Sequence, residues 1–498
     1  MSILKKLAGE TAIYGMSTII GRFLNFLLVP IYTRFFTQSD YGIVTELYSY
    51  TVFLMIFLTY GMETGFFRFS QNQEDKPNVY TTIIGSLASS SLFFIALVAV
   101  FLGPISEGLG YYSQQEYIMW MAIVIGVDAF STIPFAKLRS QNKALKFATI
   151  KLINIGINIG LNVLLIIVFP YLFRTYEYSW IPEFARQPDI AFIFISNLIA
   201  SCVTLLMLLP EIISPKDHHT FDRVLLKRIL SYSWPLLIAG LAGSINEVYD
   251  RISLRYFLTV PDGVDSSKYI LSQVGIYGAN YKLAMIIAIF NQAFRFAAEP
   301  FFFSRMHATD ARELYAKIMN YFVAFTVFIF LVIMLYIDVF KHFIGSKFHE
   351  GLHIVPILLL ANIFLGIVFN LSIWYKLSNK TRYGIWIVGF GALITIAINM
   401  AFVPIYGYVA CAWATLACYV LMTILSYRLC QKHYGIPYNL KKIGTYFLVA
   451  GLLYSADTFI SIDNAILSYS YKTLFVLAFV GIVYRIEKRS ISVLLRKK

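Results

Sequence analysis

Charged and amide side chains recur at helical spacing inside the apolar stretches of this chain, in a pattern suited to binding an anion. Arg22 and Asn25 are three residues apart, which places both on one face of a helix. A second stripe begins at Lys151 and continues through Asn154, Asn158 and Asn162. Guanidinium and ammonium groups bind phosphate strongly, and amides exchange hydrogen bonds with hydroxyl groups. The pattern predicts a site for an anionic, hydroxyl-rich substrate, although the amides could instead bond between helices.

Four of these cations have no acid three or four residues away on the same helix, namely Arg22, Lys151, Arg255 and Lys282. A charge at bilayer depth is costly, so each needs a partner, a water-filled cavity or a function. Acids on other helices, such as Glu46 or Asp128, could supply the partners. The interpretation we favour is that the four cations line a substrate cavity.

Acids at similar depth are candidates to carry a coupling proton or sodium ion, and these are Asp128, Asp250 and Glu247. Intrahelical ion pairing is an alternative explanation for some of the charges. Glu247 and Arg251 are four residues apart, as are Arg295 and Glu299. Both explanations remain open at this stage.

Patterns typical of catalysis or metal binding are missing from the sequence. The four cysteines have neither disulfide nor metal-ligand spacing. His349 and His353 have no further ligand nearby in the sequence, and there is no Gly-rich loop of the ATP-binding type. We therefore expect no enzymatic activity, no cofactor and no metal site.

The composition is that of a membrane protein. Hydrophobic residues make up 58% of the chain and charged residues 14%, against roughly 25% charged in a soluble protein. About fourteen apolar stretches have the length of roughly 20 residues that crosses a bilayer. We place them at 11–35, 41–66, 80–103, 117–136, 147–169, 190–209, 233–257, 274–298, 318–340, 352–375, 384–403, 408–429, 443–460 and 467–485.

The basic residues fall in alternate connections between these stretches. About 28 of the 41 Lys and Arg residues lie on one side, which the positive-inside rule assigns to the cytoplasm. Both termini are then cytoplasmic. The net charge of +14 is explained by these short loops, so we expect no nucleic-acid partner.

The two halves of the sequence resemble each other. Tyr41-Gly42-Ile43 opens the second stretch and Val274-Gly275-Ile276 opens the eighth. Such parallel repeats are a transporter architecture. We predict an N-terminal lobe at 1–210, a basic cytoplasmic linker at 211–231 with a surface helix at 221–230, a second lobe at 232–430, and two extra spans with a basic tail at 431–498.

Several segments also carry a family resemblance: Gly9-Glu10-Thr11-Ala12-Ile13-Tyr14-Gly15, Pro30-Ile31-Tyr32-Thr33-Arg34, Asp40-Tyr41-Gly42-Ile43 and Asn399…Pro404-Ile405-Tyr406-Gly407-Tyr408. In them the chain resembles the Wzx-type oligosaccharide flippases of the multidrug/oligosaccharidyl-lipid/polysaccharide exporter superfamily. The resemblance implies an all-α fold of two six-helix lobes in a V, with two further helices here. It also implies that alternating access moves an undecaprenyl-pyrophosphate-linked repeat unit across the bacterial inner membrane for O-antigen or capsule biosynthesis.

The resemblance further implies a monomer that works in membrane lipid beside a polysaccharide polymerase. Two functions on the same fold are alternatives: a cation-coupled multidrug antiporter, and a lipid II flippase whose extra helix pair lines a groove for the lipid tail. A drug antiporter would commonly have an acid in the first span, where this chain has Arg22. A membrane glycosyltransferase, ligase or polymerase would need a large extracytoplasmic loop, and no loop exceeds about 25 residues.

Overall fold

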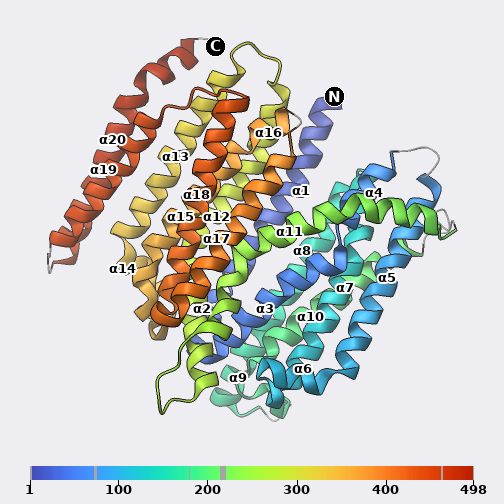
Figure 1. Ribbon diagram of the computed structural model, residues 1–498. Helices are drawn as coiled ribbons and strands as arrows, with labels where there is room; N and C mark the ends of the chain where they lie inside the picture. Colours follow the sequence, from blue (N-terminus) through green and yellow to red (C-terminus); the bar gives the residue numbers. More distant parts are fainter. Residues whose placement is uncertain are drawn as a thin grey trace. The chain divides into compact units, whose positions relative to one another are not determined.

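The computed structural model describes residues 3–71, 76–178, 180–213, 220–378, 380–460, 462 and 464–496. All regular elements in these ranges are helices (Figure 1). Thirteen helical segments among the described residues are long and apolar enough to cross a membrane. The predicted span at 443–460 is the 20-residue helix α19, which is not one of them, because charged residues at both its ends lower its hydropathy.

The first half of the chain contains α1 (Ile3–Phe26), α2 (Val29–Phe35), α3 (Gln38–Thr59), α4 (Met62–Phe69), α5 (Lys76–Val100), α6 (Leu102–Leu109), α7 (Gln115–Ser140), α8 (Ala144–Val163), the π-helix η2 (Leu164–Val168), α9 (Phe169–Tyr176), α10 (Ala191–Ile212) and α11 (Arg223–Phe257). The second half contains α12 (Ser266–Ser304), α13 (Ala311–Leu335), α14 (Ile337–Phe340), α15 (Val355–Leu371), α16 (Ile373–Leu377), α17 (Arg382–Tyr406), α18 (Tyr408–His433), α19 (Leu440–Phe459) and α20 (Ala465–Arg496). Short 3₁₀ turns lie between some of these helices.

The described chain divides into two compact units. Unit 1 comprises Met1–Gly278 and Met400–Tyr408, and unit 2 comprises Ala279–Asn399 and Val409–Lys498. In unit 1, α10 packs on α7 and α8, α1 packs on α8, and α11 packs on α3, α4 and α5. In unit 2, α13 packs on α15, α19 and α20. The lobe boundaries drawn from the sequence remain a prediction.

The helix expected at 221–230 is present and runs without a break into the seventh span. Both form α11, a helix of 35 residues. Asp222 caps its N-terminus, since the carboxylate accepts hydrogen bonds from the backbone amides of Val224 and Leu225 at 2.8 and 3.0 Å. Arg251 and Arg255 are therefore on the same helix as this basic segment.

The glycines of the predicted repeat allow two helices of unit 1 to touch. A Cβ atom on Gly42 of α3 would overlap the backbone of Leu271 in α12. A Cβ on Gly275 of α12 would overlap the backbone of Gln38 in α3. Ser272 also donates a hydrogen bond of 2.8 Å to the Gln38 side chain. Both glycines are needed because this close backbone approach leaves no room for a side chain.

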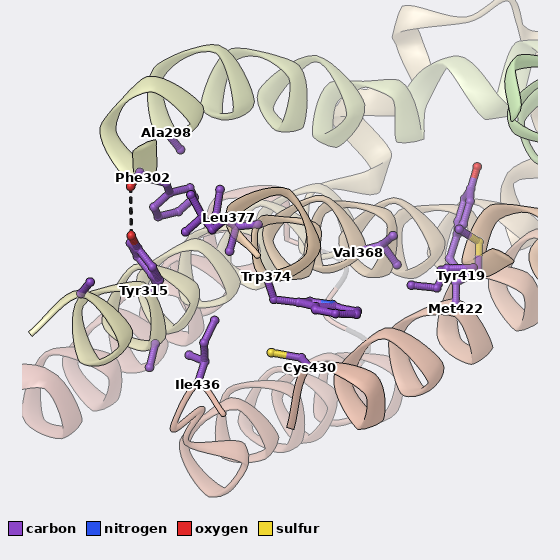
Figure 2. Close-up of a cluster of buried hydrophobic side chains, with 14 of the residues drawn as sticks. Ala298, Phe302, Tyr315, Val368, Trp374, Leu377, Tyr419, Met422, Cys430 and Ile436 are labelled. Carbon is purple, nitrogen blue, oxygen red and sulfur yellow. Dashed lines mark hydrogen bonds between the residues drawn. The ribbon is translucent and has the colours of Figure 1, made fainter. Parts of the chain in front are cut away.

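A core of aromatic and aliphatic side chains stabilises unit 2 (Figure 2). Trp374 of α16 is fully buried there, and its indole N–H donates to the Ser426 hydroxyl at 3.3 Å. Tyr315 packs edge-on against Phe302 and donates its hydroxyl to the carbonyl of that residue at 2.9 Å, which is the dashed line in Figure 2. The core holds the C-terminal end of α12 in place against α13 and α16.

The orientation in the membrane can be tested with reporter fusions. The charge alternation predicts that reporters fused after Lys143 and after Lys380 are cytoplasmic, and that a reporter fused at Gly110 is extracytoplasmic. Paired alkaline phosphatase and fluorescent protein fusions at each point measure this directly. A cytoplasmic reporter at Gly110 would overturn the assignment.

Candidate functional site

Arg255 lies in a buried polar cluster within unit 1. Its Nε atom is 3.7 Å from Oε1 of Glu46 on α3, and the two side chains are 11% and 0% exposed. The Glu46 carboxylate also accepts hydrogen bonds from the hydroxyls of Tyr111 and Tyr50, at 2.7 and 3.2 Å. Glu46 is thus the partner for Arg255, one of the two alternatives that the sequence left open.

The guanidinium group of Arg255 still has one nitrogen that could donate a hydrogen bond to a ligand. Nη2 donates to the carbonyl of Leu109, while Nη1 is buried and has no hydrogen-bond partner among the described residues. Gly110 makes room for the group, because its φ is +73° and a Cβ there would overlap Nη2. Burial, followed by the nearby Glu46 carboxylate, raises the pKa of Tyr111 well above its usual range. The Tyr111 hydroxyl therefore remains a donor to Glu46.

An apolar groove borders this cluster in unit 1. Its volume is about 560 Å³, and apolar side chains of α3, α5, α6, α7 and α11 form nearly all of its lining. Tyr50 and Leu109 belong to both features, since they line the groove and also bond to Glu46 and Arg255. The groove consequently has an apolar interior and a cation at its edge.

Lys151 and Asp128 are neighbours in unit 1. The Lys151 ammonium is 4.2 Å from the centre of the Phe135 ring, and it interacts electrostatically with Asp128 of α7. Asp128 also lies near Ser201 of α10. Packing of α10 on α7 and α8 brings these groups together. Lys151 therefore lies over an aromatic ring and within the electrostatic influence of an acid, without a direct ion pair in the described residues.

The asparagine stripe on α8 forms hydrogen bonds within unit 1. Asn154 donates to the Thr204 hydroxyl of α10 at 2.8 Å. Asn162 donates to the side chain of Asn158 at 3.1 Å and accepts from Tyr32 of α2 at 3.0 Å. The bonds to Thr204 and Tyr32 are interhelical contacts of the kind weighed as the alternative to substrate binding. The predicted role of Asn154 and Asn158 in binding substrate is not tested by them.

Arg22 has a different environment from Arg255 and Lys151. Its side chain is exposed on α1, and within the described part of the chain no hydrogen bond, ion pair or ring contact involves it. Asn25, on the same face of the helix, is exposed as well. Lys282 is half-buried on the part of α12 that belongs to unit 2.

Of the candidate coupling acids on α11, one is buried and one is exposed. Asp250 is 1% exposed and accepts a hydrogen bond of 2.7 Å from the Tyr277 hydroxyl. Glu247 is exposed, and its backbone carbonyl accepts a hydrogen bond from Arg251. The Arg251 guanidinium also lies 5.3 Å from the centre of the Tyr277 ring.

Arg295 is a site residue that the sequence did not single out. The spacing had suggested an ion pair with Glu299, but Glu299 pairs with Lys376 of α16 at 2.7 Å. Arg295 is exposed and its guanidinium lies 5.1 Å from the centre of the Phe369 ring. No ion pair with an acid involves Arg295 in the described residues. The sequence carried no sign of this ion pair, because Lys376 is 77 residues away from Glu299 along the chain and meets it only through tertiary packing.

Comparison with solved structures shows a transporter fold. The chain is similar to the lipid II flippase MurJ in an inward closed conformation, with a TM-score of 0.71, 14% identity, and coverage of 95% of this chain and 98% of that one. An inward-facing multidrug transporter of the MATE family and MOP superfamily gives a TM-score of 0.62, 12% identity and coverage of 85% and 98%. The MATE multidrug transporter DinF-BH gives a TM-score of 0.60 and 16% identity, with coverage of 87% of this chain and 97% of that one. The predicted fold class is confirmed.

Sequence comparison identifies the family. No curated protein sequence matches this chain. The model of the family described as "Polysaccharide biosynthesis protein" matches residues 7–306, which is more than half of the 498 residues. This match covers the segments from which the resemblance to oligosaccharide flippases was drawn, except the one near Pro404. The chain belongs to the polysaccharide biosynthesis protein family.

Proposed function

We propose that the protein moves an oligosaccharide linked to a polyprenyl diphosphate across the bacterial inner membrane by alternating access, for the assembly of a surface polysaccharide. The substrate has an apolar chain, a doubly charged linker and a hydroxyl-rich headgroup. Family membership and a fold similar to a lipid II flippase support a flippase or transporter in general. The specific substrate is our proposal.

The observation that carries the proposal is the presence of exposed arginines in membrane-spanning helices. Arg22 and Arg295 are both exposed and have no acidic partner within the described residues. A charge in this position is retained at considerable cost in free energy, so it indicates a function. Arginine binds phosphate through a planar fork of donors. A carrier of cationic drugs would gain nothing from these two positive charges.

The apolar groove of unit 1 supports an amphipathic substrate. Its lining is almost wholly apolar and its volume is about 560 Å³, while Arg255 donates a hydrogen bond to Leu109, one of its lining residues. This combination suits a phosphorylated lipid better than a free sugar. In the proposal, the diphosphate is attracted by four cations, which are Arg22, Lys151, Arg255 and Lys282. The sugar headgroup forms hydrogen bonds with Asn154 and Asn158.

Transport of an anion needs a source of energy. The proposed carriers of a coupling proton or sodium ion are Asp128, Asp250 and Glu247, of which Asp250 is the most deeply buried. The alternative is that the membrane potential acts on the charged linker, at about 2.3 kcal/mol per charge per 100 mV. In that case no coupling acid is required.

Complementation in cells tests the function. In a strain that lacks its own repeat-unit flippase, expression of this chain should restore surface polysaccharide, measured by immunoblot of extracted polysaccharide. In parallel, a strain depleted of its lipid II flippase should not regain growth, and a strain without drug efflux pumps should not gain resistance to cationic dyes. A chain that rescues growth or exports dyes without restoring polysaccharide would exclude the proposal in favour of one of the two alternatives.

A further inference from the structure

The first turns of α11 extend beyond what is needed to cross a bilayer. The helix has 35 residues, which makes it roughly 50 Å long, whereas about 20 residues span the hydrocarbon core. The charge alternation predicts that its N-terminal end is cytoplasmic. These lengths put the first turns of α11 at the surface of the cytoplasmic leaflet.

A pocket of about 410 Å³ lies between these turns and the end of α3, and this volume is within the range of small-molecule sites. Tyr60, which follows the last residue of α3, forms one side of it. The other lining residues are Lys227, Leu230, Ser231, Trp234 and Leu237 of α11. They recur every three or four positions, so they share one face of the helix.

Close helix packing holds this pocket in shape. α4 packs on α11 (Figure 1), and a Cβ atom on Gly65 of α4 would come within 2.8 Å of Ile229. The Ser233 hydroxyl of α11 donates to the Gly61 carbonyl at 3.4 Å. Tyr60 forms a hydrogen bond of 2.7 Å with Ser86 of α5. Both sides of the pocket are therefore attached to the packed interior of unit 1.

The α11 face of the pocket has positive charge without a counter-charge. Lys227 is exposed, as is Arg223 one turn earlier on the same face. Neither side chain forms a hydrogen bond or an ion pair within the described part of the chain, and the pocket lining includes no acid. The neighbouring Asp222 carboxylate accepts from backbone amides at the start of α11. The face is thus suited to an anion.

Exposed apolar side chains continue this face toward the bilayer. Leu230 is 40% exposed and Trp234 is 61% exposed. Tryptophan is enriched where membrane and water meet, and cations beside exposed apolar residues are typical of a helix that contacts lipid. Trp234 lies seven residues after Lys227, which is about 10 Å further along the helix. The order is therefore cation first and apolar surface deeper, as in a phospholipid.

We propose that this pocket binds an anionic phospholipid of the cytoplasmic leaflet. Arg223 and Lys227 bind the phosphate, and the acyl chains lie along Leu230 and Trp234. A zwitterionic phospholipid binds less well, because its ammonium group finds no acid in the lining. Anionic lipids are abundant in this leaflet. The inference is independent of the transported substrate.

Binding can be measured on the full-length protein without any transport. Native mass spectrometry of the chain in detergent, titrated with phosphatidylglycerol or phosphatidylcholine of identical acyl chains, gives the affinity for each lipid. Phosphatidylglycerol should bind at least about tenfold more tightly, because only its headgroup has a net negative charge to attract the two cations.

Variants assign this preference to the pocket. Arg223→Ala combined with Lys227→Ala should lower the affinity for phosphatidylglycerol about tenfold, to that for phosphatidylcholine, and Lys227→Arg alone should keep the preference. Arg305→Ala combined with Arg382→Ala is the matched control. Both of these arginines are exposed and outside the pocket lining, on loops predicted to be cytoplasmic, so binding should be unchanged. Gel filtration and thermal unfolding confirm that each variant is folded.

The inference would be overturned by equal affinity for the two phospholipids, by unchanged binding in the folded Arg223→Ala, Lys227→Ala variant, or by an equal loss in the control variant. A competition experiment identifies the kind of lipid. A short-chain polyprenyl diphosphate that displaces phosphatidylglycerol more effectively than phosphatidylglycerol itself would assign the pocket to the transported lipid instead. Weaker displacement supports a phospholipid site.

Discussion

Arg22→Ala should reduce export of the lipid-linked repeat unit at least about tenfold while the protein remains in the membrane at its normal level. The side chain is exposed and has no partner within the described residues, so its removal leaves no buried charge behind. The loss comes from charge-assisted hydrogen bonds to the substrate, each worth about 1.5–3 kcal/mol. Surface polysaccharide in the complemented strain and the amount of protein in isolated membranes measure the two effects.

Controls separate charge from structure at this position. Arg22→Lys should retain part of the activity, because an ammonium keeps the charge but loses the planar fork. Arg174→Ala should have no effect on export, since Arg174 is an exposed arginine at the end of α9 and is not one of the proposed cations. Full export by Arg22→Ala would remove the main support for an anionic substrate.

Arg255→Ala should destabilise the protein strongly. The substitution leaves the Glu46 carboxylate buried, at 0% exposure, and breaking a buried ion pair in this way costs about 3–5 kcal/mol. Glu46→Gln combined with Arg255→Ala should recover much of the stability, because the amide oxygen can still accept from Tyr111 and Tyr50. The temperature at which the monodisperse gel-filtration peak disappears in detergent measures the series.

The same series distinguishes a structural from a functional role for Arg255. The double variant restores folding but lacks the guanidinium and its unpartnered Nη1. If Arg255 binds substrate, the double variant should be stable yet defective in export. Normal export by the double variant would show that Arg255 serves only to neutralise Glu46. Arg305→Ala, at an exposed position, should match the unmodified chain in both measurements.

The sequence offered Glu46 and Asp128 as examples of acids that could neutralise cations on other helices, but could not choose between pairing and a cavity. Neither Lys151 nor Arg255 has an acid on its own helix, which left Asp128 and Glu46 as examples of partners from elsewhere. The structure places Arg255 against Glu46 and Lys151 in the field of Asp128. Spacing along one helix shows which charges lack a local partner, whereas the distant partner depends on how helices pack.

Local spacing allowed an intrahelical ion pair of Arg295 with Glu299, one of the two explanations left open, and a distant residue decides against it. Arg295 and Glu299 have the separation of an intrahelical ion pair, yet Glu299 forms its ion pair with Lys376 on α16. Nothing in the sequence around Lys376 indicates that α16 packs near α12. The consequence is an arginine that has no acid for a partner within the described residues.

The membrane spans were more predictable than the ion pairs, because they depend on the local pattern of apolar residues. Gly42 and Gly275 were noted for their matching positions, and the structure gives a reason for them in the contact of α3 with α12. The last predicted pair of spans forms α19 and α20. The continuity of α11 was missed, because the basic residues of its first turns read as a separate surface helix.

The most direct test of the account is translocation in reconstituted vesicles. Vesicles with the purified chain receive a short-chain polyprenyl diphosphate carrying a labelled oligosaccharide, and an impermeant glycosidase then reports the fraction left on the outer face over time. We predict rapid, protein-dependent movement that is reduced at least about tenfold by Arg22→Ala. An uncharged polyprenyl glycoside of the same sugar should not move. Equal movement of the charged and uncharged lipids, or movement unaffected by Arg22→Ala, would contradict recognition of the diphosphate by these cations.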